Sequence, residues 1–155
     1  AWYLRNTYHE NKLAEPDALT VCGEKIDLRR IDIPAYIYGS REDHIVPATA
    51  AYASTQMLPG KKRFVMGASG HIAGVINPPA KGKRSHWTRA DGKFPGTLDQ
   101  WLEGATEHPG SWWTDWSGWL KSHAGKQIAA PKAYGKGTKF KAIEPAPGRY
   151  VKQKA

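Results

Sequence analysis

Two short stretches decide how this chain folds: residues 40–47 read SREDHIVP, and residues 67–71 read GASGH. Each follows a short apolar run that is typical of a buried strand, residues 33–39 (IPAYIYG) and residues 62–66 (KRFVM). The pattern between the two strands is helical, which predicts a strand–helix–strand unit. Such units build parallel sheets that helices cover. We therefore expect an α/β fold.

The predicted sheet needs strands that these 155 residues do not supply. Two or three strands are too few, because each buried strand of a parallel sheet needs a neighbour on both sides. The chain also opens in the middle of an amphipathic pattern, without a helix cap. We expect the chain to be the C-terminal portion of a parallel sheet, with flanking helices, that is incomplete without upstream strands.

The remaining elements follow from local patterns. We expect a helix over residues 2–13, a β-hairpin over residues 19–28, and an irregular segment over residues 76–95. Thr97 followed by Gln100 is a capping box that opens a helix. A further helix near residues 111–122 carries a broad tryptophan face, which we interpret as core or interface packing.

The net charge of +9 is concentrated near the C-terminal end. Residues 121–155 hold nine Lys or Arg and one acid, while the other 120 residues hold 14 basic and 13 acidic side chains. We divide the chain into a folded part, residues 1–124, and a basic, extended tail, residues 125–155, whose composition lacks large apolar groups. A nearly neutral folded part argues against nucleic acid as the partner.

Other function classes are excluded by what the sequence lacks. It has no run of about eighteen apolar residues for a membrane span, and its first residues lack the pattern of a signal peptide. A single cysteine, Cys22, favours a reducing, cytoplasmic setting. The histidines and the cysteine have no spacing that is typical of a metal site, and we expect neither a metal nor a cofactor.

Asp43 lies in the loop directly after the first predicted strand. Open α/β sheets place functional groups past the carboxyl ends of their strands. A carboxylate there can orient an imidazole or accept a proton from a substrate hydroxyl. Asp43 can equally be a solvated loop acid or a cap for the helix that begins at Pro47, and the pattern leaves both interpretations open.

His71 follows the second predicted strand and is enclosed by Gly67, Gly70 and Gly74, which allow a tight turn and the approach of an acyl chain. An imidazole with a carboxylate on one nitrogen is a general base for a thiol or hydroxyl. The alternative is a buried histidine bonded to a carbonyl. A carboxylate after one strand and an imidazole after the next is also the order in which α/β hydrolases supply the last two members of a catalytic triad. We predict that Asp43 and His71 form such a pair.

The nucleophile of this triad is missing. A nucleophile elbow needs small residues on both sides and a helix after it. Cys22 instead follows Val21, has the charged Glu24 two positions on, and precedes no helical pattern. We interpret Cys22 as a small buried side chain.

A basic run, residues 81–84, lies soon after His71. Its cations can hold the phosphates of a nucleotide-tailed substrate, and Arg84 is best suited to a bidentate contact. A solvated surface run is an equally good interpretation.

Five stretches of the sequence resemble class I polyhydroxyalkanoate synthases: residues 3–8, 38–47, 67–79 (GASGHIAGVINPP), 110–113 (GSWW) and 142–151. The match runs from end to end and corresponds to the C-terminal part of such an enzyme. The resemblance implies an α/β-hydrolase-like catalytic domain that polymerises (R)-3-hydroxyacyl-CoA into polyester and releases CoA. It implies a Cys–Asp–His triad, in which Asp43 and His71 match the acid and the base.

The resemblance also sets expectations for activity and partners. The cysteine of the family stands in a Gly-x-Cys-x-Gly-Gly box that is absent here, so we expect the isolated chain to be inactive. Expected partners are the 3-hydroxyacyl-CoA substrate, the growing polyester chain, the granule surface, phasin-type proteins and, for the full-length enzyme, a second copy. The location would be the cytoplasm, at the polyester granule surface. Alternatives are an esterase or thioesterase fragment with a serine nucleophile, or a non-catalytic binding module that uses the basic tail and the tryptophan face.

Overall fold

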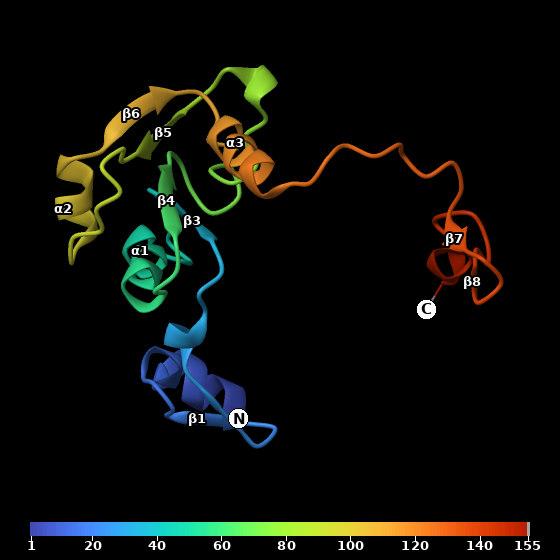
Figure 1. The fold of residues 1–155 in the computed structure, drawn as a ribbon, viewed down its shortest axis with the longest axis horizontal. Coiled ribbons are helices and arrows are strands. Elements are labelled where there is room, and N and C mark those ends of the chain that lie inside the picture. Colours follow the sequence, from blue (N-terminus) through green and yellow to red (C-terminus); the bar gives the residue numbers. More distant parts are fainter. Residues whose placement is uncertain (155) are drawn as a thin grey trace. The chain divides into compact units, whose positions relative to one another are not determined.

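The computed structural model describes residues 1–154. The chain divides into two compact units, the first being Ala1–His123 and the second beginning at Ala124. Figure 1 shows the helices and strands of both units in order along the chain. The candidate catalytic residues all belong to the first unit.

A four-stranded sheet with the strand order β3-β4-β5-β6 is the centre of the first unit. Its strands are β3 (Ala35–Ser40), β4 (Lys62–Gly67), β5 (Ser85–Thr88) and β6 (Thr106–Pro109). β3 and β4 are parallel, whereas β5 is antiparallel to both β4 and β6. The α/β class is therefore confirmed, but the sheet is mixed and only its first pair of strands is parallel.

β5 lies within residues 76–95, which the sequence predicts to be irregular, and that prediction is wrong for this strand. The inward-facing side chains of β5 are His86 and Thr88, so the strand lacks an apolar alternation. Burial of these polar groups is tolerated because each has a hydrogen-bond partner. His86 Nδ1 lies 3.2 Å from the Gly110 carbonyl oxygen, and Thr88 Oγ1 lies 2.9 Å from His108 Nε2.

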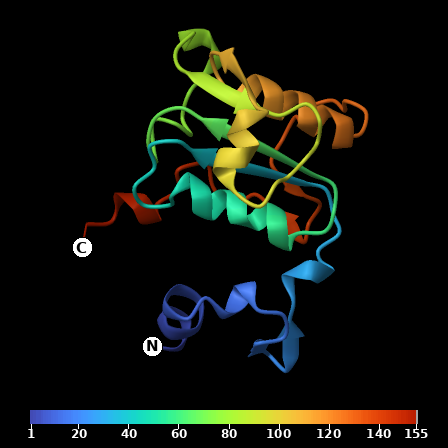
Figure 2. The same ribbon diagram turned by 90° about the vertical axis from the view of Figure 1, so that its left-hand side faces the viewer.

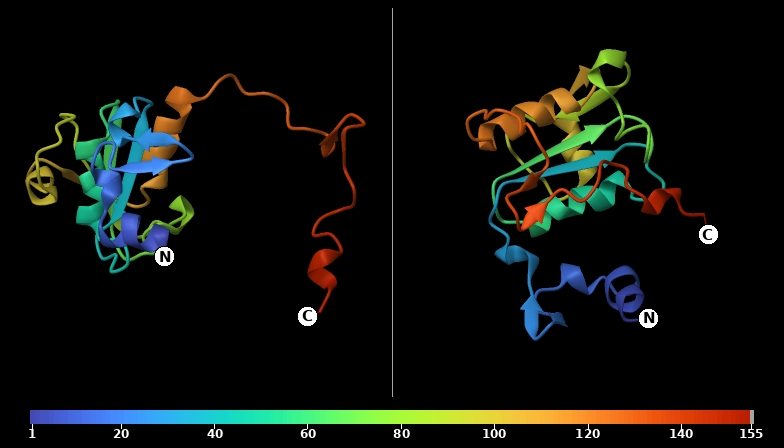
Figure 3. Two further views of the ribbon diagram at one scale, coloured as in Figure 1. Left: turned by 90° about the horizontal axis from the view of Figure 1, so that it is seen from below. Right: turned by 90° about the vertical axis from the view of Figure 1, so that its right-hand side faces the viewer.

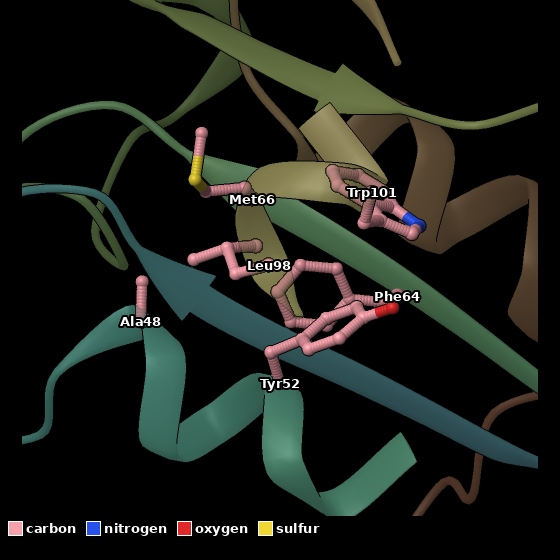
Figure 4. Packing of buried hydrophobic residues seen from close by; sticks show 6 residues of the cluster. All are labelled: Ala48, Tyr52, Phe64, Met66, Leu98 and Trp101. Carbon is pink, nitrogen blue, oxygen red and sulfur yellow. The ribbon is translucent and has the colours of Figure 1, made fainter. Parts of the chain in front are cut away.

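One face of the sheet is covered by α1 (Ala48–Met57) and α2 (Leu98–Glu103). Phe64, on β4, lies between Tyr52 of α1 and Trp101 of α2, with ring centroids 5.0 Å and 4.9 Å away and the rings edge-on (Figure 4). All three side chains are at most 2% exposed. Burial of one such side chain contributes about 2–3 kcal/mol, so this cluster fixes α1 and α2 on the sheet.

The starts of both helices follow the sequence prediction. Pro47 precedes α1, as its preference for the first turn of a helix predicts. Thr97 Oγ1 accepts a hydrogen bond from the backbone N–H of Gln100, 3.3 Å away, at the start of α2. The predicted cap is confirmed.

The opposite face of the sheet is covered by α3 (Trp113–His123), as the two views of Figure 3 show. Tyr36 Oη and Arg63 Nε both donate to Oδ1 of Asp115, at 2.9 Å and 2.7 Å. Since Tyr36 is on β3 and Arg63 on β4, a single carboxylate ties α3 to both parallel strands. The predicted helix with its tryptophan face is confirmed, and Trp112 packs against the sheet.

Residues before β3 form short elements that lie at the lower end of the first unit in Figure 2. The hairpin of β1 (Leu19–Val21) and β2 (Glu24–Ile26) is confirmed. The helix predicted over residues 2–13 is instead a π-helix, Leu4–His9, followed by a 3₁₀ turn, Lys12–Ala14. Its large apolar side chains are exposed in this unit, so no packing selects a longer α-helix.

The second unit has little regular structure. Its elements are β7 (Gly135–Lys136), β8 (Phe140–Lys141) and a 3₁₀ turn, Tyr150–Lys152. Nearly all of its described residues are exposed. Among residues 1–154, no helix combines the length and the apolar composition that crossing a membrane requires.

Candidate active site

The loops that follow β3 and β4 lie side by side, because parallel strands end at the same edge of the sheet. Two backbone hydrogen bonds join the loops beyond the strands. The N–H of Arg41 donates to the Gly67 carbonyl (2.8 Å), and the N–H of Glu42 donates to the Ser69 carbonyl (3.0 Å). These bonds carry the strand pairing forward to the residue before Asp43.

The two predicted site residues are in direct contact. Asp43 Oδ2 lies 2.8 Å from His71 Nδ1, although 28 residues separate them. The other carboxylate oxygen, Oδ1, accepts the backbone N–H groups of Ile45 and Val46, both at 2.9 Å. Asp43 therefore stabilises the turn before α1 and contacts the imidazole at the same time. It is neither a solvated loop acid nor a cap for α1, whose N-cap residue is Pro47.

The charge of Asp43 is stabilised by these contacts. Its side chain is only 7% exposed, and burial by itself raises the pKa of a carboxyl group. The N–H of Val46, the His71 ring and the N–H of Ile45 together outweigh that burial and hold the pKa of Asp43 below its ordinary value. An ionised carboxylate can only accept hydrogen bonds, so Asp43 favours the Nδ1–H tautomer of a neutral imidazole, and that tautomer has its Nε2 lone pair free to take a proton.

His71 itself is open to a reaction partner. Its side chain is 42% exposed, so it is not the buried histidine bonded to a carbonyl that the sequence left as an alternative. The turn that carries it is closed by the Gly74 N–H, which donates to the Gly70 carbonyl at 2.8 Å. A Cβ atom on Gly74 would lie 2.4 Å from Ser40 Oγ, so only glycine fits where this turn meets the end of β3.

Comparison with curated proteins finds close relatives of this chain among named enzymes. The chain is 65% identical over 154 residues to poly(3-hydroxyalkanoate) polymerase subunit PhaC of Cupriavidus necator, covering 99% of the chain and 26% of that protein. This chain is homologous to a segment of the poly(3-hydroxyalkanoate) polymerases. The predicted resemblance is confirmed.

Further polymerases match at lower identity. The polymerase subunit PhaC of Rhizobium etli is 44% identical over 154 residues (99% of the chain, 23% of the relative), and poly(3-hydroxyalkanoate) polymerase 1 of Ectopseudomonas oleovorans is 40% identical over 151 residues (97% and 26%). The chain thus spans about a quarter of the length of the curated relatives it matches. No family model matches it.

Arg84, the third predicted site residue, is exposed and lies just before β5. The structure does not bring its guanidinium into a hydrogen bond with Asp43 or His71 within residues 1–154. Burial raises the pKa of the nearby Tyr38 hydroxyl. The hydrogen bond with Ser40 opposes that effect, the Asp43 charge adds to it, and the Arg84 charge opposes it slightly.

Cys22 is not buried, and the sequence interpretation of this residue is wrong. It lies in the β1–β2 turn with a φ of 50°, and its side chain is exposed. A two-residue turn requires positive φ, and Gly23 beside it has a φ of 85°. In Figure 1 this hairpin lies below β3 and β4, away from the loops that carry Asp43 and His71.

The contribution of the tryptophan face to the site could not be predicted from the sequence. Trp112 and Trp113 donate hydrogen bonds to the loop that carries His71. Their spacing predicts only an aromatic helix face. Nothing in a single sequence shows which backbone carbonyls such side chains reach.

Proposed function

We propose that this chain supplies the acid and the base of a polyhydroxyalkanoate synthase, which polymerises (R)-3-hydroxyacyl-CoA to polyester with release of CoA. The single observation that supports it is the 2.8 Å contact between Asp43 and His71 in a chain so similar to named polymerases. The esterase alternative has no support among the reported relatives, because each is named a polymerase.

We further propose that the sheet is part of an α/β-hydrolase-like domain. β3 lies at one end of the strand order, so its outer edge has no partner strand among the described residues. An unpaired strand edge invites another strand. In the complete polymerase, a strand from the other three quarters of the protein would pair with β3 and bring the nucleophile to the ends of β3 and β4.

In the proposed reaction, His71 is the general base for a cysteine thiol supplied by that upstream part. Nε2 accepts the thiol proton, and the thiolate attacks the carbonyl carbon of the acyl-CoA. The bond to the CoA sulfur breaks, CoA leaves as a thiol with the proton from the imidazolium, and the acyl group remains on the cysteine.

Chain growth would reuse the same pair. Nε2 takes the proton of a 3-hydroxyl group, whose oxygen attacks the acyl-cysteine carbonyl to form an ester, and the cysteine leaves as a thiol with that proton. Asp43 keeps His71 in the Nδ1–H tautomer throughout and stabilises the imidazolium that forms. A hydrogen bond from the 3-hydroxyl to Asp43 is a second way for the carboxylate to help activation.

The remaining proposals concern binding. Arg84 would contact the phosphates of CoA, since an exposed guanidinium suits phosphate and the residue follows the His71 loop along the chain, just before β5. The complete enzyme would work as a homodimer in the cytoplasm, at the surface of the polyester granule and alongside phasin-type proteins. The basic tail would remain an extended segment from about residue 125.

The proposal is tested in a chimaera, in which this chain replaces the matching quarter of the Cupriavidus necator polymerase. With 3-hydroxybutyryl-CoA, His71→Ala should lower CoA release by about 10³-fold or more. His9→Ala changes an exposed histidine of the N-terminal π-helix and should leave the rate near that of the parent. Near-normal turnover of His71→Ala would refute the role of base.

The isolated 155-residue chain serves as the second control. It should release no CoA from the same substrate, because Cys22 lies in a hairpin turn rather than beside His71. Measurable release by the isolated chain would show that the reaction needs no upstream cysteine.

A further inference from the structure

We propose that Trp112 and Trp113 are positioning residues that hold the His71 turn at the correct distance from Asp43. The inference concerns the geometry of the pair, and its consequence for turnover rests on the proposed function. The contacts that link these residues all lie within the first unit, Ala1–His123.

The two indoles donate to consecutive carbonyls of the loop that carries His71. Trp112 Nε1 donates to the Gly74 carbonyl at 3.1 Å, and Trp113 Nε1 donates to the Val75 carbonyl at 2.9 Å. A tryptophan N–H is a donor with a fixed direction on a rigid ring. Two such donors on consecutive carbonyls therefore restrict both the distance of this loop from the indoles and its rotation.

Trp112 also connects the His71 loop to the loop that carries Asp43. Its ring is 9% exposed and stacks on Tyr38 of β3, with centroids 4.3 Å apart and planes inclined by 30°. Tyr38 Oη in turn lies 3.0 Å from Oγ of Ser40, the last residue of β3. The Trp112 indole thus connects the loop that carries His71 to the end of β3, where the loop that carries Asp43 begins.

The helix that carries Trp113 is itself fixed to the same two strands. Asp115 binds Tyr36 of β3 and Arg63 of β4 from the first turn of α3. Because the carboxylate is largely buried, removal of either partner is costly. The support for the His71 loop is therefore built on the strands from which both loops depart.

The His71 imidazole needs such support. Its side chain is 42% exposed, and within the described residues it is held by the hydrogen bond to Asp43. The position of the His71 ring is thus set by the backbone turn that carries it and by Asp43, rather than by side chains packed around it. A displacement of about 1 Å at a catalytic group can lower the rate by about 10²-fold.

A purely structural role for the tryptophans is the competing explanation, and Trp116 provides the matched control. It lies on α3, as Trp113 does, and its ring is 5.6 Å from that of Trp112, but among residues 1–154 it has no hydrogen bond to the His71 loop. Phenylalanine in place of each tryptophan removes the N–H donor and keeps an aromatic ring. Trp112 is buried, so its replacement also removes packing, whereas Trp113 and Trp116 are both partly open to solvent. The comparison of Trp113→Phe with Trp116→Phe therefore reports the donated hydrogen bond.

The first measurement is the tautomer of His71 in the 155-residue chain, read by NMR from its ring carbon and nitrogen shifts at a pH where the ring is neutral. The parent should hold Nδ1–H, because Asp43 accepts from that nitrogen. Asp43→Asn provides the reference for a ring freed of its carboxylate. Trp112→Phe and Trp113→Phe should move His71 toward that reference, whereas Trp116→Phe should not.

The second measurement is turnover of 3-hydroxybutyryl-CoA by the chimaera. Trp113→Phe should lower kcat by about tenfold to a hundredfold with KM within about twofold, since binding contacts are untouched. Trp113 is only half-buried, so this variant stays folded if Trp112→Phe does not.

The outcomes separate the inference from the proposed function. An unchanged tautomer in both Trp112→Phe and Trp113→Phe overturns the inference, as does an equal change in Trp116→Phe. A changed tautomer with a reduced kcat supports both proposals. A changed tautomer with unchanged turnover supports the positioning role and counts against His71 as the base.

Discussion

Replacement of Gly74 by alanine tests how tightly the His71 turn is built onto the end of β3. A Cβ atom at this position would lie 2.4 Å from Ser40 Oγ, 2.7 Å from the Gly70 carbonyl oxygen and 2.9 Å from the Ala68 carbonyl oxygen. Two of these three atoms are backbone, so no side-chain rotation relieves the overlap. The turn must move away from Ser40, and His71 must move with it.

The cost follows from these contacts. Overpacking at a well-packed site costs about 1–3 kcal/mol. Alanine also lowers the conformational entropy of the unfolded chain, which stabilises the folded state by about 0.4–1 kcal/mol. We expect Gly74→Ala to lower the free energy of unfolding of the first unit by about 1–2 kcal/mol. For a unit of this size, that corresponds to a decrease in Tm of roughly 5 °C.

Thermal unfolding followed by tryptophan fluorescence measures this change. All seven tryptophans lie in the first unit, so the signal reports its unfolding alone. Gly96→Ala is the matched control, because a Cβ atom there would meet nothing within 4 Å. It should change stability by less than about 0.5 kcal/mol. Equal Tm values for Gly74→Ala and the parent would refute the steric argument, and unchanged turnover of the chimaera would refute its link to His71.

Two further predictions concern charged side chains. Burial opposes ionisation of Asp115, but the hydrogen bonds from Arg63 and Tyr36 outweigh it and hold its pKa below the ordinary value of 3.8. A carboxyl group with a depressed pKa stabilises the fold above its unfolded pKa and loses that effect as the pH falls through the folded pKa. In denaturant unfolding, the roughly 1–2 kcal/mol deficit of Asp115→Asn should therefore be constant down to about pH 5 and shrink as the pH falls to 3.8 and below. A deficit that does not shrink there would contradict the assignment. Arg84→Ala in the chimaera should raise KM for the CoA thioester by about tenfold and leave KM for a CoA-free thioester unchanged, and equal effects on both substrates would exclude phosphate binding.

The sequence alone determined those features that depend on residues close together along the chain. The strand–helix–strand unit, the cap at Thr97 and the hairpin around Gly23 each arise from local backbone preference, and the structure contains them. The positions of Asp43 and His71 after successive parallel strands also allowed their contact to be predicted. Adjacent parallel strands end at one edge, whatever lies elsewhere in the fold.

Only the tertiary structure decided the features that depend on distant partners. β5 is a strand because β4 and β6 flank it, although its buried residues His86 and Thr88 are polar. Cys22 is exposed because of the turn it occupies, not because of its residue type. The hydrogen bonds of Trp112 and Trp113 cross 38 residues of sequence to reach the His71 loop. Periodicity predicts the face of an element on which a side chain lies, but the atoms that meet it are set by how the elements pack together.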